Sequence, residues 1–125
     1  MNRPFAGLDN RARGRLGEEE AEKFLRRQGY KILRRNFSCR SGEIDVIAEQ
    51  GGELCFIEIK ARATREFGGA IEALTATKRR RITKAASFYL TRHPEDRPSR
   101  FDVVAMDLEG SEWRFTLVQN AFEAS

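Results

Sequence analysis

The stretch EIDVIAEQGGELCFIEIKA, residues 43–61, decides the fold. Two segments rich in Ile, Val and Phe, 43–49 and 53–61, flank the tripeptide Gln50-Gly51-Gly52. Apolar, β-branched segments on either side of a glycine pair are typical of a β-hairpin. We therefore expect two neighbouring antiparallel strands here.

Polar side chains interrupt this hairpin at Asp45, Glu58 and Lys60. Strand residues of one parity share a face, so Glu58 and Lys60 lie side by side. A two-residue turn at Gly51-Gly52 sets a register in which Asp45 lies opposite Glu58. The same register places Lys60 opposite Glu43. We expect two carboxyl groups and an amine to converge on one face of the hairpin.

Two carboxylates that face each other across a strand pair repel and need a cation between them. Lys60 supplies part of that charge, but Mg²⁺ or Mn²⁺ with oxygen ligands suits the pair better. Such an ion activates water for phosphodiester hydrolysis, and a nearby ammonium orients the water or offsets charge in the transition state. We predict Asp45 and Glu58 as metal ligands and Lys60 as a catalytic residue. Alternatively, Glu58 and Lys60 form a solvent-facing ion pair and Asp45 is a surface strand residue.

A helix is predicted from an Asp9 cap to Gln28, ended by Gly29. Its narrow packing face carries Gly14, Gly17, Ala21, Phe24, Leu25 and Gln28. Glu18 lies at the border of that face, whereas Glu19 and Glu20 rotate toward water. We predict that Glu18 binds a second metal or positions water. The alternative is a charge near the helix N-terminus, favoured by the macrodipole.

The other elements follow from apolar periodicity and turn residues. They are a strand at 30–33 with a polar turn through 36–42, a loop at 64–70, a helix at 75–92 ended by Pro94 and Pro98, and strands at 101–107 and 113–118. The order α-β-β-β-α-β-β predicts an α/β fold with a central mixed five-stranded sheet flanked by helices.

The length of 125 residues is room for one domain, and we expect a single domain over 1–125 with its core at about 9–120. No apolar stretch reaches the length of a membrane span, and the Arg-rich N-terminus lacks the apolar segment of a signal peptide. The protein is expected in the cytoplasm, with no membrane partner. Cys39 and Cys55 lack a metal-binding spacing and His93 is the single histidine, so no zinc site is expected.

Net charge is +4, and 18 of the 23 cationic residues are arginine. Because guanidinium offers a planar fork of donors to phosphate oxygens, such a surface suits nucleic acid. The expected contacts are a basic run opening the second long helix, with two arginines just after the Lys60 strand. These residues are Arg62, Arg65, Lys78, Arg79, Arg80, Arg81 and Lys84. A solvated basic face is the competing interpretation.

Several short motifs follow one another along the chain. They are Gly17-Glu18 with Ala21, Asn36, Gly42-Glu43-Ile44-Asp45, Phe56-Ile57-Glu58-Ile59-Lys60 with Arg62, Phe67-Gly68, Lys78 and Phe101-Asp102-Val103-Val104. In these motifs the chain resembles the YraN-type family of small bacterial endonuclease-like proteins. The resemblance covers about residues 14–120. That family is similar to Holliday junction resolvases and to the restriction-endonuclease-like group, whose core motif is an Asp, a spacer and Glu-x-Lys.

The resemblance implies a restriction-endonuclease-like fold and a metal-dependent endonuclease that acts on structured or branched DNA. It implies that Asp45 and Glu58 hold Mg²⁺ or Mn²⁺, that Lys60 is the catalytic lysine, and that Glu18 is the helix-borne acid of the resolvase branch. Ala61 departs from the generic pattern, in which a hydroxyl residue is common. The resemblance is compatible with a homodimer, because resolvase-like enzymes that cut two strands usually pair.

Two other classes of function fit the same sequence. A nucleic-acid-binding module would keep the fold and the basic surface but do no chemistry. A structural partner of a larger complex would hold the carboxylates in internal ion pairs.

Overall fold

The computed structural model describes residues 10–62 and 74–124, and for residues 10–16 and 62 it describes the backbone alone. The predicted cap Asp9, the predicted loop at 64–70 and Arg65 lie outside the described residues.

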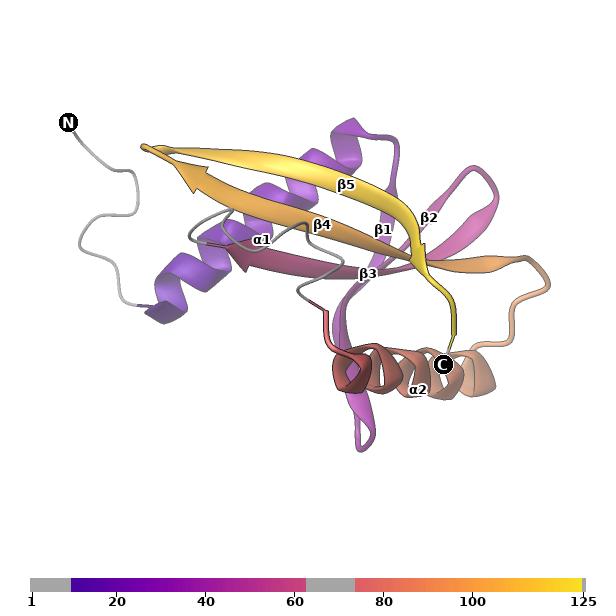
Figure 1. The fold of residues 1–125 in the computed structure, drawn as a ribbon. Coiled ribbons are helices and arrows are strands. Elements are labelled where there is room, and N and C mark those ends of the chain that lie inside the picture. The colour runs from indigo at the N-terminus through magenta and orange to yellow at the C-terminus, as the bar shows by residue number, and fades with distance from the viewer. Residues whose placement is uncertain (1–9, 63–73, 125) are drawn as a thin grey trace.

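Two helices and five strands make up the described chain. They are α1 (Asn10–Arg27), β1 (Lys31–Cys39), β2 (Gly42–Gln50), β3 (Glu53–Arg62), α2 (Ala76–Arg92), β4 (Ser99–Glu109) and β5 (Glu112–Phe122). The strands form one mixed sheet in the order β1-β2-β3-β4-β5, in which only β3 and β4 are parallel (Figure 1). A parallel pair needs a long crossover, and α2 lies in that connection. The predicted element order and α/β arrangement are confirmed.

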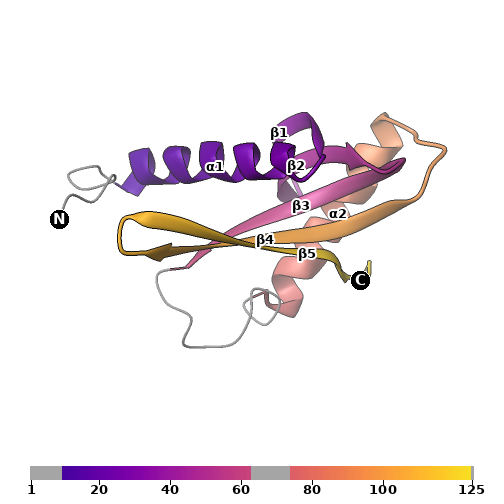
Figure 2. The same cartoon turned by 90° about the horizontal axis from the view of Figure 1, so that it is seen from above.

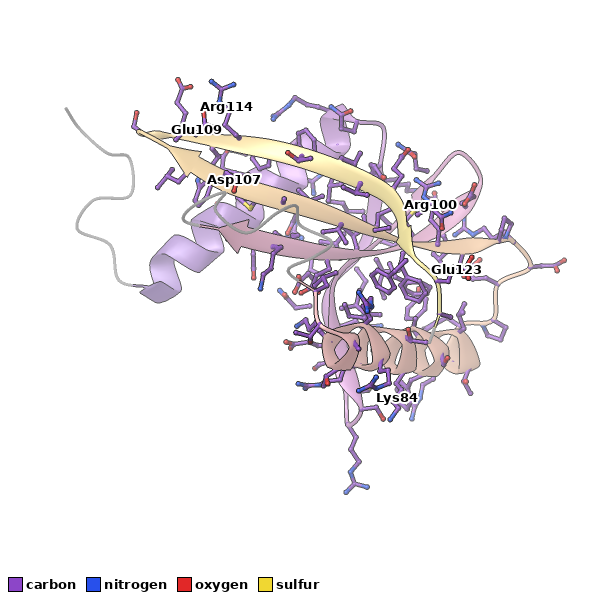
Figure 3. The ribbon with its side chains drawn as sticks, in the orientation of Figure 1. Lys84, Arg100, Asp107, Glu109, Arg114 and Glu123 are labelled. Carbon is purple, nitrogen blue, oxygen red and sulfur yellow. The ribbon has the colours of Figure 1, made fainter. Side chains whose placement is uncertain are left out.

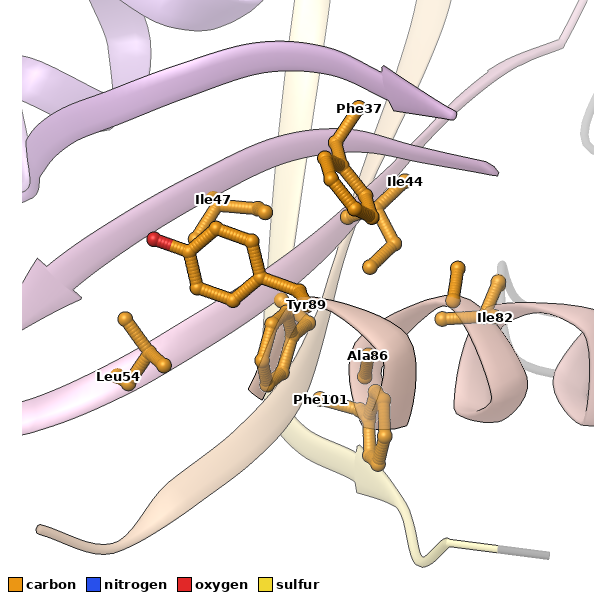
Figure 4. Close-up of a cluster of buried hydrophobic side chains, with 10 residues drawn as sticks. Phe37, Ile44, Ile47, Leu54, Ile82, Ala86, Tyr89 and Phe101 are labelled. Carbon is orange, nitrogen blue, oxygen red and sulfur yellow. The ribbon is translucent and has the colours of Figure 1, made fainter. Parts of the chain in front are cut away.

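The two helices cover opposite faces of the sheet (Figure 2). Along β3, Leu54 and Phe56 belong to the buried cluster that includes α2, whereas Cys55 and Ile57 belong to the cluster that includes α1. Figure 4 shows the α2 cluster, in which Tyr89 of α2 lies among side chains of four strands. Neither described helix has the long apolar stretch that a membrane crossing requires.

The polar turn predicted for residues 36–42 is wrong over most of its length. β1 continues to Cys39, and only Arg40 and Ser41 form the turn. Asn, Ser and Gly favour turns in isolation. Here pairing with β2 and burial of Phe37 override that local preference.

β1 and β2 change faces at Asn36 and Asp45. Ile44 packs in the α2 cluster and Val46 packs in the α1 cluster, although residues two apart on a regular strand share a face. The ladder between the strands has no Asn36–Asp45 pair, and Asn36 has a φ of 50°. Such a local irregularity increases the twist of a strand pair and re-aims its side chains. Asp45 therefore lies at a kink, not at an ordinary strand position.

A buried polar network ties β4 to its neighbours on the α1 side. Asp102 is fully buried and accepts hydrogen bonds from the Tyr30 hydroxyl at 2.7 Å, the Arg100 Nε at 3.0 Å and the Asn120 N–H at 2.9 Å. Burial is the main cause that raises the pKa of Tyr30 to about 12. The Phe101-Asp102 motif is thus explained by internal hydrogen bonds.

Gly42 fixes how closely α2 approaches the β1–β2 hairpin. A Cβ at Gly42 would overlap the backbone carbonyl of Arg81, and Arg81 belongs to α2. Backbone atoms cannot move aside as the end of a long side chain can. The helix therefore docks on a position that only glycine allows.

We expect Gly42→Ala to lower the free energy of unfolding by about 1–3 kcal/mol, because overpacking forces the helix away from the hairpin. Gly17→Ala is the matched control. Its Cβ would lie 3.5 Å from Met106 Cε, an ordinary contact, and alanine favours the helix by up to about 1 kcal/mol. Urea unfolding of both variants measures the difference, and equal effects would contradict the close-approach argument.

Candidate functional site

The β2–β3 hairpin has the predicted register, but its ladder ends beside the site. Pairs run from Gln50–Glu53 to Val46–Ile57 and stop there. In place of a further backbone acceptor, Asp45 Oδ2 accepts the Ile59 N–H at 2.8 Å. The Asp45 carboxyl therefore lies in the plane of the sheet, in the split where β2 leaves β3.

Glu58 lies next to this split, on the face of the sheet that α2 covers. Its side chain is buried, and its Oε1 is 3.4 Å from the Nζ of Lys78 in the first turn of α2. Its Oε2 is also buried, and no described residue donates a hydrogen bond to it. The carboxyls of Asp45 and Glu58 are near enough for their charges to interact. The two side chains thus lie near each other as the hairpin register predicts, although Asp45 and Glu58 do not form a ladder pair.

The pKa values of both carboxyls are raised. For Glu58, burial first and the charge of Asp45 second raise the pKa to about 8, against the opposing effect of Lys78. For Asp45, burial raises the pKa and the Ile59 N–H partly offsets it. Without another cation the pair therefore holds a proton near neutral pH.

Lys60 lies on the same face of β3 as Glu58. Their partners on β4, Val103 and Ala105, belong to one buried cluster, and the Lys60 side chain is half-buried. The predicted pairing of Lys60 with Glu43 is wrong. The ladder has ended before that point, and Glu43 instead pairs with Ser38 of β1 and is exposed.

Glu18 lies on α1, close enough to Asp45 for their charges to interact. Burial, followed by the charges of Asp45 and Glu22, raises the pKa of Glu18. Within residues 10–62 and 74–124, however, no group of three acidic, His or Cys side chains is placed to hold one metal ion. Glu18 thus borders the Asp45–Glu58 pair without completing a three-ligand cluster.

The basic residues at the start of α2 have different surroundings. Lys78 contacts Glu58, Arg79 Nη1 donates to the Leu74 carbonyl at 3.1 Å, and Arg80 Nη2 donates to the Thr77 hydroxyl at 3.2 Å. Arg81 and Lys84 are exposed. Of the predicted arginines after β3, Arg62 is placed by its backbone alone and Arg65 is not described.

Sequence reasoning missed two ion pairs near the site. Lys78 was predicted to bind phosphate, but its ammonium lies on Glu58. Glu22 was assigned to no contact, yet it is buried and forms an ion pair with Arg35, with its Oε1 2.7 Å from Arg35 Nε. A signal for Glu22 is its position one turn after Glu18, on the same side of the helix. The docking of α2, which brings Lys78 to Glu58, has no signature in local sequence.

The donor set fits a hard divalent cation. Two carboxyls supply oxygen atoms, one of them buried and without a donor, and Mg²⁺ is usually held by one or two carboxylates and several waters. No soft ligand lies in this set, since Cys55 packs in the α1 cluster. Asp45 and Glu58 would hold such an ion, with α2 supplying one ammonium beside them.

The fold and the site together define a small α/β protein with a carboxyl pair, one member of which is buried, where two strands split apart. Residues 17–106 match the model of the uncharacterised protein family UPF0102. The chain is 45% identical over 119 residues to a UPF0102 protein of Lachnoclostridium phytofermentans, covering 94% of this chain and 98% of the relative. It is 48% identical over 114 residues to one of Symbiobacterium thermophilum, covering 89% and 96%. The chain belongs to the UPF0102 family, which confirms the family resemblance; these names assign no activity.

We expect the metal-free protein to lose stability as the pH rises from about 5 to about 8.5. The pKa of Glu58 in the folded protein is about 8, above its ordinary value of 4.5. Neutral Glu58 therefore contributes its full stabilisation below pH 4.5, and this contribution is lost as the pH rises through 8. Urea unfolding in EDTA should show this fall in wild type, and Glu58→Gln should flatten it.

Glu49→Gln is the control. A hydrogen bond from Arg97 lowers the pKa of Glu49, so the titration of Glu49 changes the stability of the protein at acid pH. Adding Mg²⁺ should stabilise wild type more at pH 8 than at pH 5.5, since the ligands must be deprotonated. A pH profile unchanged by Glu58→Gln would contradict the buried-pair interpretation.

Proposed function

We propose that this protein is a metal-dependent endonuclease that hydrolyses phosphodiester bonds in structured or branched DNA. The observation that carries the proposal is the buried, undonated Oε2 of Glu58 beside the Asp45 carboxyl. A buried carboxyl oxygen without a donor, beside a second carboxyl, is unfavourable in a purely structural site, and the pair suits a divalent ion.

The residues of the chain have separate tasks in this proposal. A bound Mg²⁺ or Mn²⁺ would polarise a phosphoryl oxygen and lower the pKa of its water. The Ile59 N–H holds Asp45 in the split, and the Lys78 ammonium balances the charge of Glu58. Lys60, on the Glu58 face of β3, is the cation available to the attacking water or to the developing charge. Glu18 orients water from the α1 side.

DNA is the proposed substrate because exposed cations flank the acidic pair. Arg81 and Lys84 continue along α2 from Lys78, and phosphate contacts of this kind position a duplex without reading its sequence. Cleavage of both strands of a branched substrate would require two sites, and hence a homodimer.

A second candidate is a nucleic-acid-binding module with the same fold and no chemistry. The observation that favours it is that the described residues offer two close carboxyl groups but no cluster of three ligands. Salt-sensitive binding without divalent-dependent cleavage would identify this function.

We expect the purified protein to nick a four-way or flapped DNA substrate with Mg²⁺ or Mn²⁺ and to be inactive in EDTA. Glu58→Gln should reduce cleavage by at least 100-fold, because the ion would lose a charged ligand. Glu49→Gln, at the far end of the same hairpin, should cleave like wild type. Substrates with single-stranded, duplex, flap and four-way structures, compared on one gel, identify the preferred one.

Circular dichroism and urea unfolding check that Glu58→Gln is folded. Cleavage that survives this substitution in the folded variant would remove the proposed mechanism. Cleavage that is insensitive to EDTA would do the same.

A further inference from the structure

One face of α2 carries exposed cations around an exposed aromatic ring. Arg81, Lys84, Phe88 and Arg92 follow one another at intervals of three or four residues, so they lie on one side of the helix. Phe88 is 39% exposed, one of two large apolar side chains exposed to that degree in the described chain. Figure 3 shows Lys84 on the side of α2 away from the sheet.

The β1–β2 hairpin extends this face. The ring of Phe37 lies 6.1 Å from the ring of Phe88, measured between centroids. The Arg34 guanidinium lies 5.2 Å from the Phe37 ring, and the Arg92 guanidinium lies 4.8 Å from the Phe88 ring. Each of these two adjoining rings thus has an arginine of its own element beside it, Arg34 on β1 and Arg92 on α2. We call Arg34, Arg81, Lys84, Phe88 and Arg92 the α2 strip.

Several other arginines of the described chain have a carboxylate partner. Arg35, Arg97, Arg100 and Arg114 each have a carboxylate within ion-pair distance. In the described part of the chain, no carboxylate pairs with a cation of the strip. Glu43 of the neighbouring hairpin lies on the face of the hairpin opposite α2. A Cβ at Gly42 and the side chain of Ile44, on either side of Glu43, both face α2.

The strip leads toward the acidic pair. Lys78, which contacts Glu58, lies one turn before Arg81 on the same helix. From Arg81 to Arg92 the helix rises by about 16 Å. A polyanion lying along the strip would therefore extend toward the Lys78 end of the helix, where Lys78 contacts the buried Glu58.

We propose that a single-stranded segment of nucleic acid binds along the α2 strip, with one base stacked on Phe88 and the phosphates contacting Arg81, Lys84, Arg92 and Arg34. Exposed cations beside an exposed ring form the combination that holds unpaired strands, because every base has a face to stack and every nucleotide has a phosphate. A duplex keeps its bases stacked and offers no face to Phe88. The assignment of this strand to the substrate rests on the proposed function, whereas the binding surface does not.

The test of the ring is binding of a fluorescein-labelled 20-nucleotide oligo(dT) to the full chain in EDTA, followed by fluorescence anisotropy. Phe88→Ala and Phe88→Leu should weaken binding by roughly five-fold or more, the lower end of the effect of losing one base stack. Phe88→Trp should bind as wild type or tighter. Its added tryptophan emission should be quenched by the oligonucleotide beyond the change seen in wild type, in which Trp113 is the single tryptophan.

The test of the cations is the salt dependence of the same binding. The double variant Lys84→Gln, Arg92→Gln should reduce the slope of log affinity against log salt by roughly 1.4, since each single-strand phosphate contact contributes about 0.7. Arg114→Gln is the matched control. Arg114 is paired with Glu109 at 3.0 Å and lies at the far end of the β4–β5 hairpin from Lys84 (Figure 3). Its slope should equal that of wild type.

Equal affinity in wild type and in Phe88→Ala would overturn the proposal, and so would equal weakening by Ala, Leu and Trp at that position. Equal binding of an intact duplex, unaffected by Phe88, would overturn it as well. So would self-association of the protein that depends on Phe88 without oligonucleotide binding. These outcomes are separable from those of the proposed function, because strand binding in EDTA needs no metal and Glu58→Gln should retain it.

Discussion

The hydrogen bond from the Ile59 N–H to the Asp45 carboxylate is the interaction on which the site depends. At this point β2 leaves β3, and the amide of Ile59 would lose its acceptor at the centre of a sheet. A buried amide without an acceptor is costly, so the side chain that replaces the ladder carbonyl has little freedom. The bond therefore fixes an ionisable group inside the protein, and Glu58, at the next position of β3 beyond the ladder, is brought against it.

The helix α2 makes this arrangement tolerable. Two adjacent carboxyls would favour an open split, but Lys78 places an ammonium 3.4 Å from the buried Glu58. Two local features fix where that ammonium lies: the Thr75 hydroxyl caps the helix by accepting the Lys78 N–H, and Gly42 lets the helix backbone approach the hairpin. Packing and electrostatics are thus coupled, since a shift of α2 would also move the charge that balances Glu58.

The hairpin and the approach of Asp45 to Glu58 could be predicted from sequence because both depend on a local turn. Gly51 and Gly52 have φ values of 60° and 80°, as a type I′ turn requires at both positions, and the turn determines the register. Local reasoning failed where distant segments decide. The kink at Asn36 and Asp45 ended the register before Lys60 could pair with Glu43. The contact of Lys78 depends on how α2 docks, which a run of four cations does not encode.

The same docking explains why neighbouring cations of one helix have different environments. A helix that lies across a sheet turns about a third of its residues inward. Lys78 lies at the end of α2 where the sheet splits, and its side chain reaches an acid that is present only there. Arg81, Lys84 and Arg92 lie further along, on the outer side of the helix, where they are exposed. One helix therefore places an ammonium beside the acidic pair at its first turn and carries exposed cations further along, which puts an acidic centre next to a cationic surface.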